Sequence, residues 1–164
     1  MIRSATVADA QAICSIYNHF ILQSTVTFEE TAIAPDDMAA RIGAVAGRLP
    51  FLVAELDGAV AGYAYAAPWK ARSAYRHTVE SSVYVAPGFA GMGLGSRLYQ
   101  ALLQDLRERG VHAVLAGIAL PNSASIGLHE AFGFARVGQM REVGRKFGQW
   151  LDVGYWQLLL APQP

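Results

Sequence analysis

The spacing of hydrophobic residues along the chain predicts two long amphipathic helices. After a short strand at residues 2–5, apolar residues recur every three to four positions from Ala12 to Ile21, on one face of a helix. A second helix is marked by leucines one turn apart, at Leu94, Leu98, Leu102 and Leu106. It is expected to end at Gly110, because glycine is favoured just past a helix C-terminus. Shorter helices are predicted at about 35–46 and 122–132.

Runs rich in β-branched and aromatic residues predict strands between these helices. The runs at 51–56 and 59–66 flank Asp57-Gly58, a dipeptide typical of a tight hairpin turn, and residues 68–73 are expected to form a loop. Further strands are predicted at 78–85, 112–119, 135–146 and 150–160. The order β-α-α-β-β-β-α-β-α-β-β predicts a mixed α/β sheet with helices on both faces.

Composition and charge favour one compact domain over residues 1–164. Hydrophobic residues make up 53% of the chain and charged residues 16%, which argues against disorder. Thirteen basic and thirteen acidic side chains balance, so we expect no general attraction to nucleic acid or to an anionic membrane. No stretch approaches the roughly 20 apolar residues that span a bilayer. Cys14 is the only cysteine, and with no apolar leader the chain is expected to be cytoplasmic.

The segment from Val83 to Ser96 joins a predicted strand to a predicted helix and has features of an anion site. Unpaired backbone N–H groups at a helix start, together with the positive end of the helix dipole, attract phosphate. Gly91, Gly93 and Gly95 allow the backbone to approach a pyrophosphate closely. The segment therefore predicts a diphosphate ligand, although the same glycines also fit a plain turn.

Two other nucleotide-binding patterns fit this segment less well. A Walker loop ends in Gly-Lys-Ser or Gly-Lys-Thr, and the segment has no such end. A dinucleotide-binding fold has an acidic residue about 20 positions downstream, at the end of the next strand, and residues 113–119 contain none. Coenzyme A is the common diphosphate ligand that remains.

The same segment resembles the coenzyme A motif of the GNAT superfamily of N-acetyltransferases. Val85-x-Pro87 and the three glycines precede the leucine-striped helix as in that motif, with Ala90 where Arg or Gln is usual. Residues 122–134 are similar to a second motif of the family, in which an Asn opens a helix and Gly-Phe follows it. The resemblance implies a GNAT-like mixed, mostly antiparallel central sheet of about seven strands with about four helices. It also implies acetyl-CoA as co-substrate, and we expect no metal.

Three further segments, 68–75, 78–85 and 146–154, look like the subgroup that acetylates phosphinothricin and methionine sulfoximine. Thr25 to Phe28 also fits this subgroup. The resemblance implies transfer of acetyl to the α-amine of a small amino-acid-like acceptor, methionine sulfone included. It further implies herbicide resistance as a side activity, and a homodimer whose interface completes the acceptor pocket. The sequence does not name the physiological acceptor.

Two residues are candidates for proton transfer. Glu80 is a carboxylate in an otherwise apolar strand, which is costly unless the group is paired or functional, and the resemblance places the general base there. His129 stands where many relatives have a tyrosine that protonates the departing thiolate, and imidazole titrates near neutral pH. An ordinary salt bridge for Glu80 and a structural role for His129 stay open. The backbone N–H near Val83 is the expected oxyanion donor.

The binding residues follow from the same resemblance. The expected coenzyme A contacts are Val83, Tyr84, Val85, Gly91, Met92, Gly93, Leu94, Gly95, Ser96, Asn122 and Ser125. The expected acceptor contacts are Phe28, Lys70, Arg72, Ser73 and Tyr75. Arginine can clamp a carboxylate or phosphinate with two parallel hydrogen bonds. A solvated loop and a core phenylalanine are the simpler readings of these acceptor residues.

Two other functions compete with this hypothesis. A protein N-terminal acetyltransferase needs an open peptide groove, and the charged loop at Lys70 and Arg72 favours a small closed site instead. A non-catalytic acyl-CoA sensor would have no use for the carboxylate of Glu80. Release of free coenzyme A only after addition of an amine separates an enzyme from a sensor.

Overall fold

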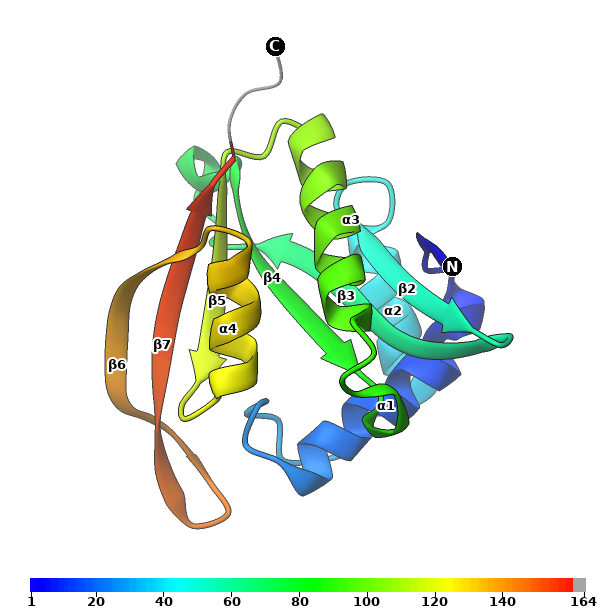
Figure 1. Cartoon of the computed structure of the whole chain (residues 1–164), viewed down its shortest axis with the longest axis horizontal. Helices are drawn as coiled ribbons and strands as arrows, with labels where there is room; N and C mark the ends of the chain where they lie inside the picture. The colour runs from blue at the N-terminus through cyan, green and yellow to red at the C-terminus, as the bar shows by residue number, and fades with distance from the viewer. Residues whose placement is uncertain (161–164) are drawn as a thin grey trace.

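The structure, a computed structural model, describes residues 1–160, which form one twisted sheet with helices on both faces (Figure 1). The strands are β1 (Ile2–Ser4), β2 (Phe51–Leu56), β3 (Ala59–Pro68), β4 (Thr78–Val85), β5 (Ala113–Ala119), β6 (Ala135–Lys146) and β7 (Gln149–Leu159). The α-helices are α1 (Ala10–Gln23), α2 (Pro35–Val45), α3 (Leu94–Glu108) and α4 (Ser123–Ala131). The predicted order of elements is confirmed, with β3 reaching two residues beyond its predicted end.

Within residues 1–160 the sheet has seven strands in the order β1-β2-β3-β4-β5-β7-β6. Every neighbouring pair is antiparallel except β4 and β5, which are parallel. Helices α3 and α4 cover one face, and α1 and α2 cover the other (Figure 1). The predicted mixed, mostly antiparallel sheet with four helices is confirmed.

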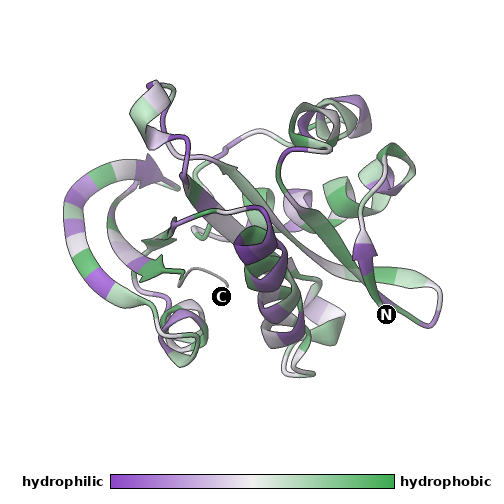
Figure 2. Ribbon diagram, turned by 90° about the horizontal axis from the view of Figure 1, so that it is seen from above, coloured by the Kyte–Doolittle hydropathy of each residue, from purple (hydrophilic) through white to green (hydrophobic). Residues whose placement is uncertain are grey.

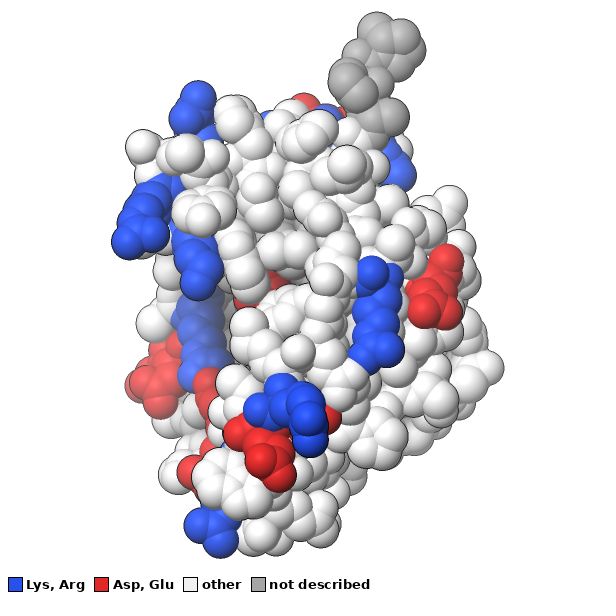
Figure 3. Space-filling view, turned by 90° about the vertical axis from the view of Figure 1, so that its left-hand side faces the viewer, with Lys and Arg blue, Asp and Glu red and all other residues white. Residues whose placement is uncertain are grey.

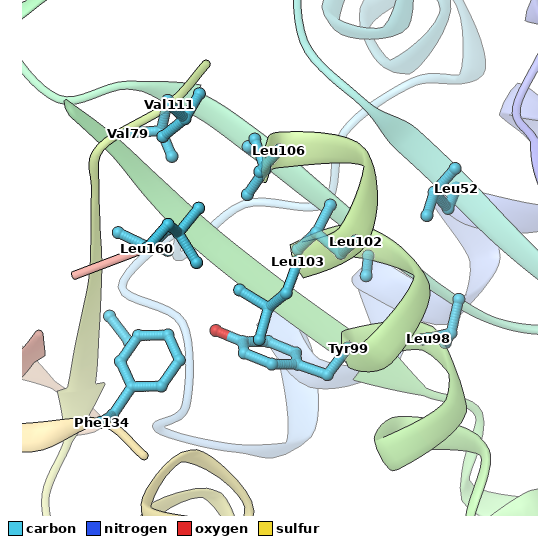
Figure 4. Packing of buried hydrophobic residues seen from close by; sticks show 14 of the residues in the cluster. Leu52, Val79, Leu98, Tyr99, Leu102, Leu103, Leu106, Val111, Phe134 and Leu160 are labelled. Carbon is cyan, nitrogen blue, oxygen red and sulfur yellow. The ribbon is translucent and has the colours of Figure 1, made fainter. Parts of the chain in front are cut away.

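The leucine stripe of α3 anchors the larger of two hydrophobic clusters. Leu98, Leu102 and Leu106 are fully buried against the sheet, and Figure 4 shows them pointing from α3 toward β-strand residues such as Leu52 and Val79. Burying each such side chain is worth about 1.5–3 kcal/mol relative to exposure. The stripe holds the start of α3 in a fixed position beside the end of β4. Figure 2 shows the outer sides of the helices more hydrophilic than the sides that face the sheet.

The second cluster lies under α1 and α2 and is rich in aromatic rings. Phe51, Tyr63 and Tyr65 stack in parallel on β2 and β3, and Tyr84 of β4 continues the stack from Tyr63. Cys14 belongs to this cluster and is 2% exposed, so it packs as a small core residue. This cluster fixes β4 from the face opposite α3.

The two central strands separate part-way along their length. β4 pairs with β5 only from Thr78 opposite Ala113 to Glu80 opposite Leu115. β4 stays paired with β3 as far as Val85, and β5 stays paired with β7 as far as Ala119. The facing edges of β4 and β5 therefore diverge beyond Glu80, as Figure 1 shows, and carry no ladder hydrogen bonds to each other. None of the helices in residues 1–160 is long and apolar enough to cross a membrane.

Candidate active site

A cavity of about 290 Å³ occupies the opening between the diverging strands. Its walls are residues 81–85 of β4 and residues 116–119 of β5, and its floor comes from the start of α4. Six of the predicted coenzyme A contacts line it: Val83, Tyr84, Val85, Gly95, Asn122 and Ser125. On β4 the cavity lining begins at Ser81, the residue after the catalytic candidate Glu80, and on α3 it includes Gly95 of the glycine-rich turn.

The other predicted coenzyme A contacts lie in that turn rather than in the cavity wall. Gly91 and Gly93 have φ of 77° and 73°, a left-handed backbone that favours glycine. Met92 and Ser96 are exposed, whereas the side chain of Leu94 is 4% exposed and belongs to the core. Of the groups of Leu94, only the backbone N–H is thus available to a ligand. Gly93 is the N-cap of α3, so the turn presents the unpaired N–H groups of the helix start to solvent.

The start of α4 is built as the sequence motif predicts. The side chain of Asn122 accepts a hydrogen bond from the backbone N–H of Ser125 at 3.1 Å and caps the helix. Asn122 and Ser125 thereby face the cavity from the side opposite Val83 to Val85.

Glu80 lies where the strands begin to separate. Its carboxylate oxygen Oε1 lies beside Gly117 of β5, so close that a Cβ built on Gly117 would approach it to 3.0 Å. The ring of Tyr155 also lies beside Gly117, with Cε1 3.2 Å from the same Cβ position. Burial raises the pKa of Glu80 above its ordinary value. Within residues 1–160 no salt bridge or hydrogen bond involves this carboxylate, so the structure supplies no partner for the salt-bridge reading.

His129 lies at the other side of the cavity in a buried hydrogen-bond chain. It is 3% exposed and lines the cavity. One ring nitrogen, Nδ1, lies 2.7 Å from the carbonyl oxygen of Ser125, and the other, Nε2, lies 2.8 Å from the hydroxyl of Tyr99. Burial lowers the pKa of His129 below its ordinary value, with the Ser125 carbonyl opposing that shift. Both ring nitrogens are thus satisfied by the protein in this structure.

The predicted acceptor loop lies in a separate, basic groove. Lys70, Arg72, Ser73 and Tyr75 line this groove together with the first two residues of β4. Lys70 Nζ lies 5.2 Å from the ring centre of Trp69, within the range of a cation–π contact. Thr78 and Val79, the two residues before Glu80 on β4, complete the lining of the groove. Figure 3, which shows the side of β6 and β7, has Lys and Arg side chains gathered along one margin beside a hollow.

Phe28 belongs to the connection between α1 and α2 and packs against β6. A Cβ on Gly144 would lie 2.6 Å from Phe28 Cδ2 and 2.7 Å from Phe28 Cζ, so the ring lies flat against the glycine. Phe28 is 38% exposed, which does not fit the reading as a plain core residue. Its neighbour Val26 lines the central cavity.

Sequence reasoning missed the residues that hold this connection in place. Lys146, which is 2% exposed, donates a hydrogen bond from Nζ to the backbone carbonyl of Thr27 at 2.8 Å. The hydroxyl of Thr27 shares a 2.8 Å hydrogen bond with Tyr17 of α1. Lys146 lies in one of the segments that resemble the subgroup, but nothing in the pattern indicates a buried lysine.

Comparison with known proteins agrees with this geometry. Residues 2–154 match the family model described as an acetyltransferase (GNAT) domain. The chain belongs to the GNAT acetyltransferase family. It is 49% identical to a phosphinothricin N-acetyltransferase of Streptomyces viridochromogenes, over 95% of this chain and 85% of that protein. It is 42% identical to an L-methionine sulfoximine/L-methionine sulfone acetyltransferase of Salmonella typhimurium, over 97% of this chain and 94% of that protein.

A solved structure supports the same assignment. An acetyltransferase from Salmonella typhimurium with its cofactor acetyl-CoA superposes with a TM-score of 0.96 and 41% identity, covering 100% of this chain and 95% of that chain. Membership in the GNAT family confirms the predicted N-acetyltransferase class. The roles of individual residues stay predictions. Among residues 1–160, no group of three or more His, Cys, Asp or Glu side chains could hold a metal ion.

Proposed function

We propose that this protein transfers acetyl from acetyl-CoA to the α-amine of a small, anionic amino-acid-like acceptor, such as phosphinothricin, methionine sulfoximine or methionine sulfone. The observation that carries this proposal is the place of Glu80. Its carboxylate is half-buried and unpaired within residues 1–160, at the point where β4 and β5 separate, and it follows on β4 the two residues that line the basic groove. The names of the relatives at 49% and 42% identity support the acceptor class.

Acetyl-CoA is assigned to the cavity between the diverging strands. The free edge of β4 from Val83 to Val85 offers backbone groups to the pantetheine arm, as an added strand would pair. The turn from Gly91 to Ser96 then receives the diphosphate at the start of α3. The acetyl-CoA complex of the Salmonella typhimurium structure supports a site on this fold.

The chemistry needs one proton removed and one supplied. Glu80, directly or through a water, takes a proton from the acceptor ammonium, because only the free amine attacks the thioester. Burial raises the pKa of Glu80, which makes its carboxylate a stronger base than that of an exposed glutamate. The backbone N–H of Val83 donates to the developing oxyanion. We assign to His129 the supply of the proton that the departing thiolate takes up.

The acceptor is assigned to the basic groove and the surface near Phe28. Lys70 and Arg72 receive its anionic groups, with Ser73 and Tyr75 beside them. Phe28 covers the acceptor from the other side, held there by the contact of Lys146 with Thr27. This arrangement favours a small acceptor over a protein N-terminus.

We also propose a single-domain, cytoplasmic homodimer, with herbicide resistance as a side activity. β6 is the edge strand, alternates hydrophilic and hydrophobic residues along its curve in Figure 2, and exposes Val137, Met140 and Val143 by 48–55%. Trp150 at the start of β7 is 60% exposed. Trp156, by contrast, is 2% exposed and serves the core. Sedimentation of the protein and of Val143→Glu tests the dimer: we expect a dimer that this variant weakens, and a monomeric wild type contradicts the proposal.

The test of function is release of free coenzyme A from acetyl-CoA, measured with a panel of amines. Phosphinothricin, methionine sulfoximine, methionine sulfone, common amino acids and a peptide with a free N-terminus form the panel. Release that depends on the small amino-acid analogues supports the proposal. Release with the peptide alone favours an N-terminal acetyltransferase, and tight acetyl-CoA binding with no release favours a sensor.

A further inference from the structure

Three buried side chains from three elements form a hydrogen-bonded chain across the core. The hydroxyl of Ser81 on β4 lies 2.5 Å from the hydroxyl of Tyr99 on α3, and Tyr99 lies 2.8 Å from Nε2 of His129 on α4. Their exposed fractions are 5%, 0% and 3%. Figure 4 shows the Tyr99 ring extending from α3 into the core with its hydroxyl directed away from the helix.

The carbonyl of Ser125 fixes the direction of the protons in this chain. A carbonyl oxygen only accepts, so Nδ1 of His129 must carry a hydrogen. A neutral imidazole has a single N–H, which leaves Nε2 as an acceptor for the Tyr99 hydroxyl. The single hydroxyl hydrogen of Ser81 has two acceptors within reach, the Tyr99 oxygen at 2.5 Å and the Leu115 carbonyl at 3.3 Å. Because the Tyr99 hydrogen already goes to His129, the shorter contact needs the Ser81 hydrogen, and the Tyr99 oxygen accepts it. The hydrogen bonds donated by Ser81 and Tyr99 therefore both point toward His129, which in turn donates to the Ser125 carbonyl.

The surroundings of His129 contain rings and neutral hydrogen-bond partners. Tyr99 of α3 and Phe134 contact the imidazole edge-on, at ring-centre distances of 4.8 and 5.1 Å. Besides the Ser125 carbonyl, the hydroxyl of Ser125 lies 3.3 Å from Nδ1. No salt bridge within residues 1–160 includes His129, and its lowered pKa has burial as its largest cause. A neutral resting imidazole follows from these contacts.

Both ends of the chain reach the cavity assigned to acetyl-CoA. Ser81 and His129 line that cavity, while Tyr99 connects them behind its wall. Ser81 follows Glu80 on β4, and successive side chains of a strand point to opposite faces of the sheet. Glu80 and Ser81 thus approach the point of divergence from the two faces of the sheet.

We propose that Ser81, Tyr99 and His129 form a relay that carries the second amine proton to the departing thiolate. The inference rests on the proposed acetyl transfer. Glu80 removes the first proton, and the free amine attacks, which forms the C–N bond and an oxyanion. The nitrogen, now positively charged, passes its second proton to Ser81 Oγ. In concert, the Ser81 proton moves to Tyr99, and the Tyr99 proton moves to Nε2 of His129.

The relay then runs in the opposite direction. The imidazolium is held by its Nδ1–H bond to the Ser125 carbonyl while the C–S bond breaks and the oxyanion returns to a carbonyl. The thiolate takes a proton from Ser81, Tyr99 reprotonates Ser81, and His129 reprotonates Tyr99. One proton has moved from nitrogen to sulfur, and the three side chains are restored. Ser81 touches the reacting atoms, Tyr99 acts through its neighbours, and His129 stores the proton.

Tyr99→Phe tests the relay because it keeps the ring in the core and removes the hydroxyl. We expect kcat to fall by about 100-fold, with the KM for acetyl-CoA within about twofold of wild type. Ser81→Ala is expected to act in the same direction. Tyr63→Phe is the matched control, since Tyr63 is a buried tyrosine, 1% exposed, outside the relay. Thermal melting of each variant identifies any loss of fold, and two relay variants keep the test available if one of them unfolds.

A solvent isotope measurement separates a relay from a merely structural chain. In mixtures of H2O and D2O, the wild-type rate should depend on the deuterium fraction along a curve, because several protons move together. In Tyr99→Phe the dependence should become linear. Turnover by the wild type together with near-normal kcat in Tyr99→Phe and Ser81→Ala overturns the relay and leaves the proposed function intact. No amine-dependent turnover by the wild type overturns both.

Discussion

Gly144→Ala offers a way to displace Phe28 without touching the catalytic residues. A methyl group at this position would lie 2.6 and 2.7 Å from ring carbons Cδ2 and Cζ of Phe28. Carbon atoms in contact normally stay about 3.5–4.0 Å apart, so the ring has to move by about 1 Å. Phe28 is 38% exposed and has room to move toward solvent.

The size of the effect on stability follows from the burial of that ring. Full burial of a phenylalanine is worth about 1.5–3 kcal/mol, and Phe28 is only partly buried, so losing part of its packing costs about 1 kcal/mol. For a chain of this size that lowers Tm by about 2–4 °C. If Phe28 covers the acceptor, a shift of about 1 Å raises the acceptor KM or lowers kcat by at least about tenfold.

Steady-state release of coenzyme A, with the acceptor and acetyl-CoA varied in turn, measures this effect. Gly138→Ala is the matched control on the same strand, because a Cβ there meets no atom within 4 Å. The acetyl-CoA KM should be unchanged in both variants. If Gly144→Ala lowers Tm yet keeps the acceptor kinetics of Gly138→Ala, Phe28 does not cover the acceptor.

Three further predictions concern the base Glu80, the basic groove at Arg72 and the buried Lys146. Burial raises the pKa of Glu80, and a base works only when it is deprotonated. In a pH–rate profile, kcat/KM should therefore fall with decreasing pH, with an apparent pKa above the ordinary value of 4.5. An apparent pKa at or below 4.5 contradicts this prediction. Arg72→Lys should raise the acceptor KM by about tenfold, because lysine cannot form the two parallel hydrogen bonds, and an unchanged KM in kinetic titrations removes Arg72 from the site. Lys146→Met should lower the free energy of unfolding by about 1–3 kcal/mol in urea titrations, because the buried carbonyl of Thr27 loses its donor; unchanged stability argues against that contact.

Local periodicity in the sequence predicts most of the fold. The leucine stripe of α3 and the turn at Asp57-Gly58 are short-range patterns, and each element lies where its pattern predicts. The divergence of β4 from β5 is not a local property. It depends on β5 pairing with β7, which comes 30 or more residues later.

Only part of the site could be predicted, because local patterns do not show contacts between distant segments. Glu80 and the glycine turn are conspicuous in the sequence, because a carboxylate in an apolar strand and closely spaced glycines are unusual there. Tyr99 reads as one more core residue of the α3 stripe, and only the three-dimensional contact with His129 gives it another role. Lys146 was missed because its partner, the backbone carbonyl of Thr27, lies 119 residues away. Contacts between distant segments are what periodicity does not predict.

Amine-dependent acetyl transfer with Glu80 as the base is tested by comparing the release of coenzyme A by two proteins. Coenzyme A release is followed for the wild type and Glu80→Gln, with acetyl-CoA alone and with phosphinothricin or methionine sulfone added. We expect release by the wild type only with an acceptor, and a kcat lower by at least about 100-fold in Glu80→Gln with unchanged acetyl-CoA binding. Near-normal turnover by Glu80→Gln contradicts the role of Glu80 as the base, and a wild type that binds acetyl-CoA but acetylates neither acceptor contradicts the proposed acetyl transfer.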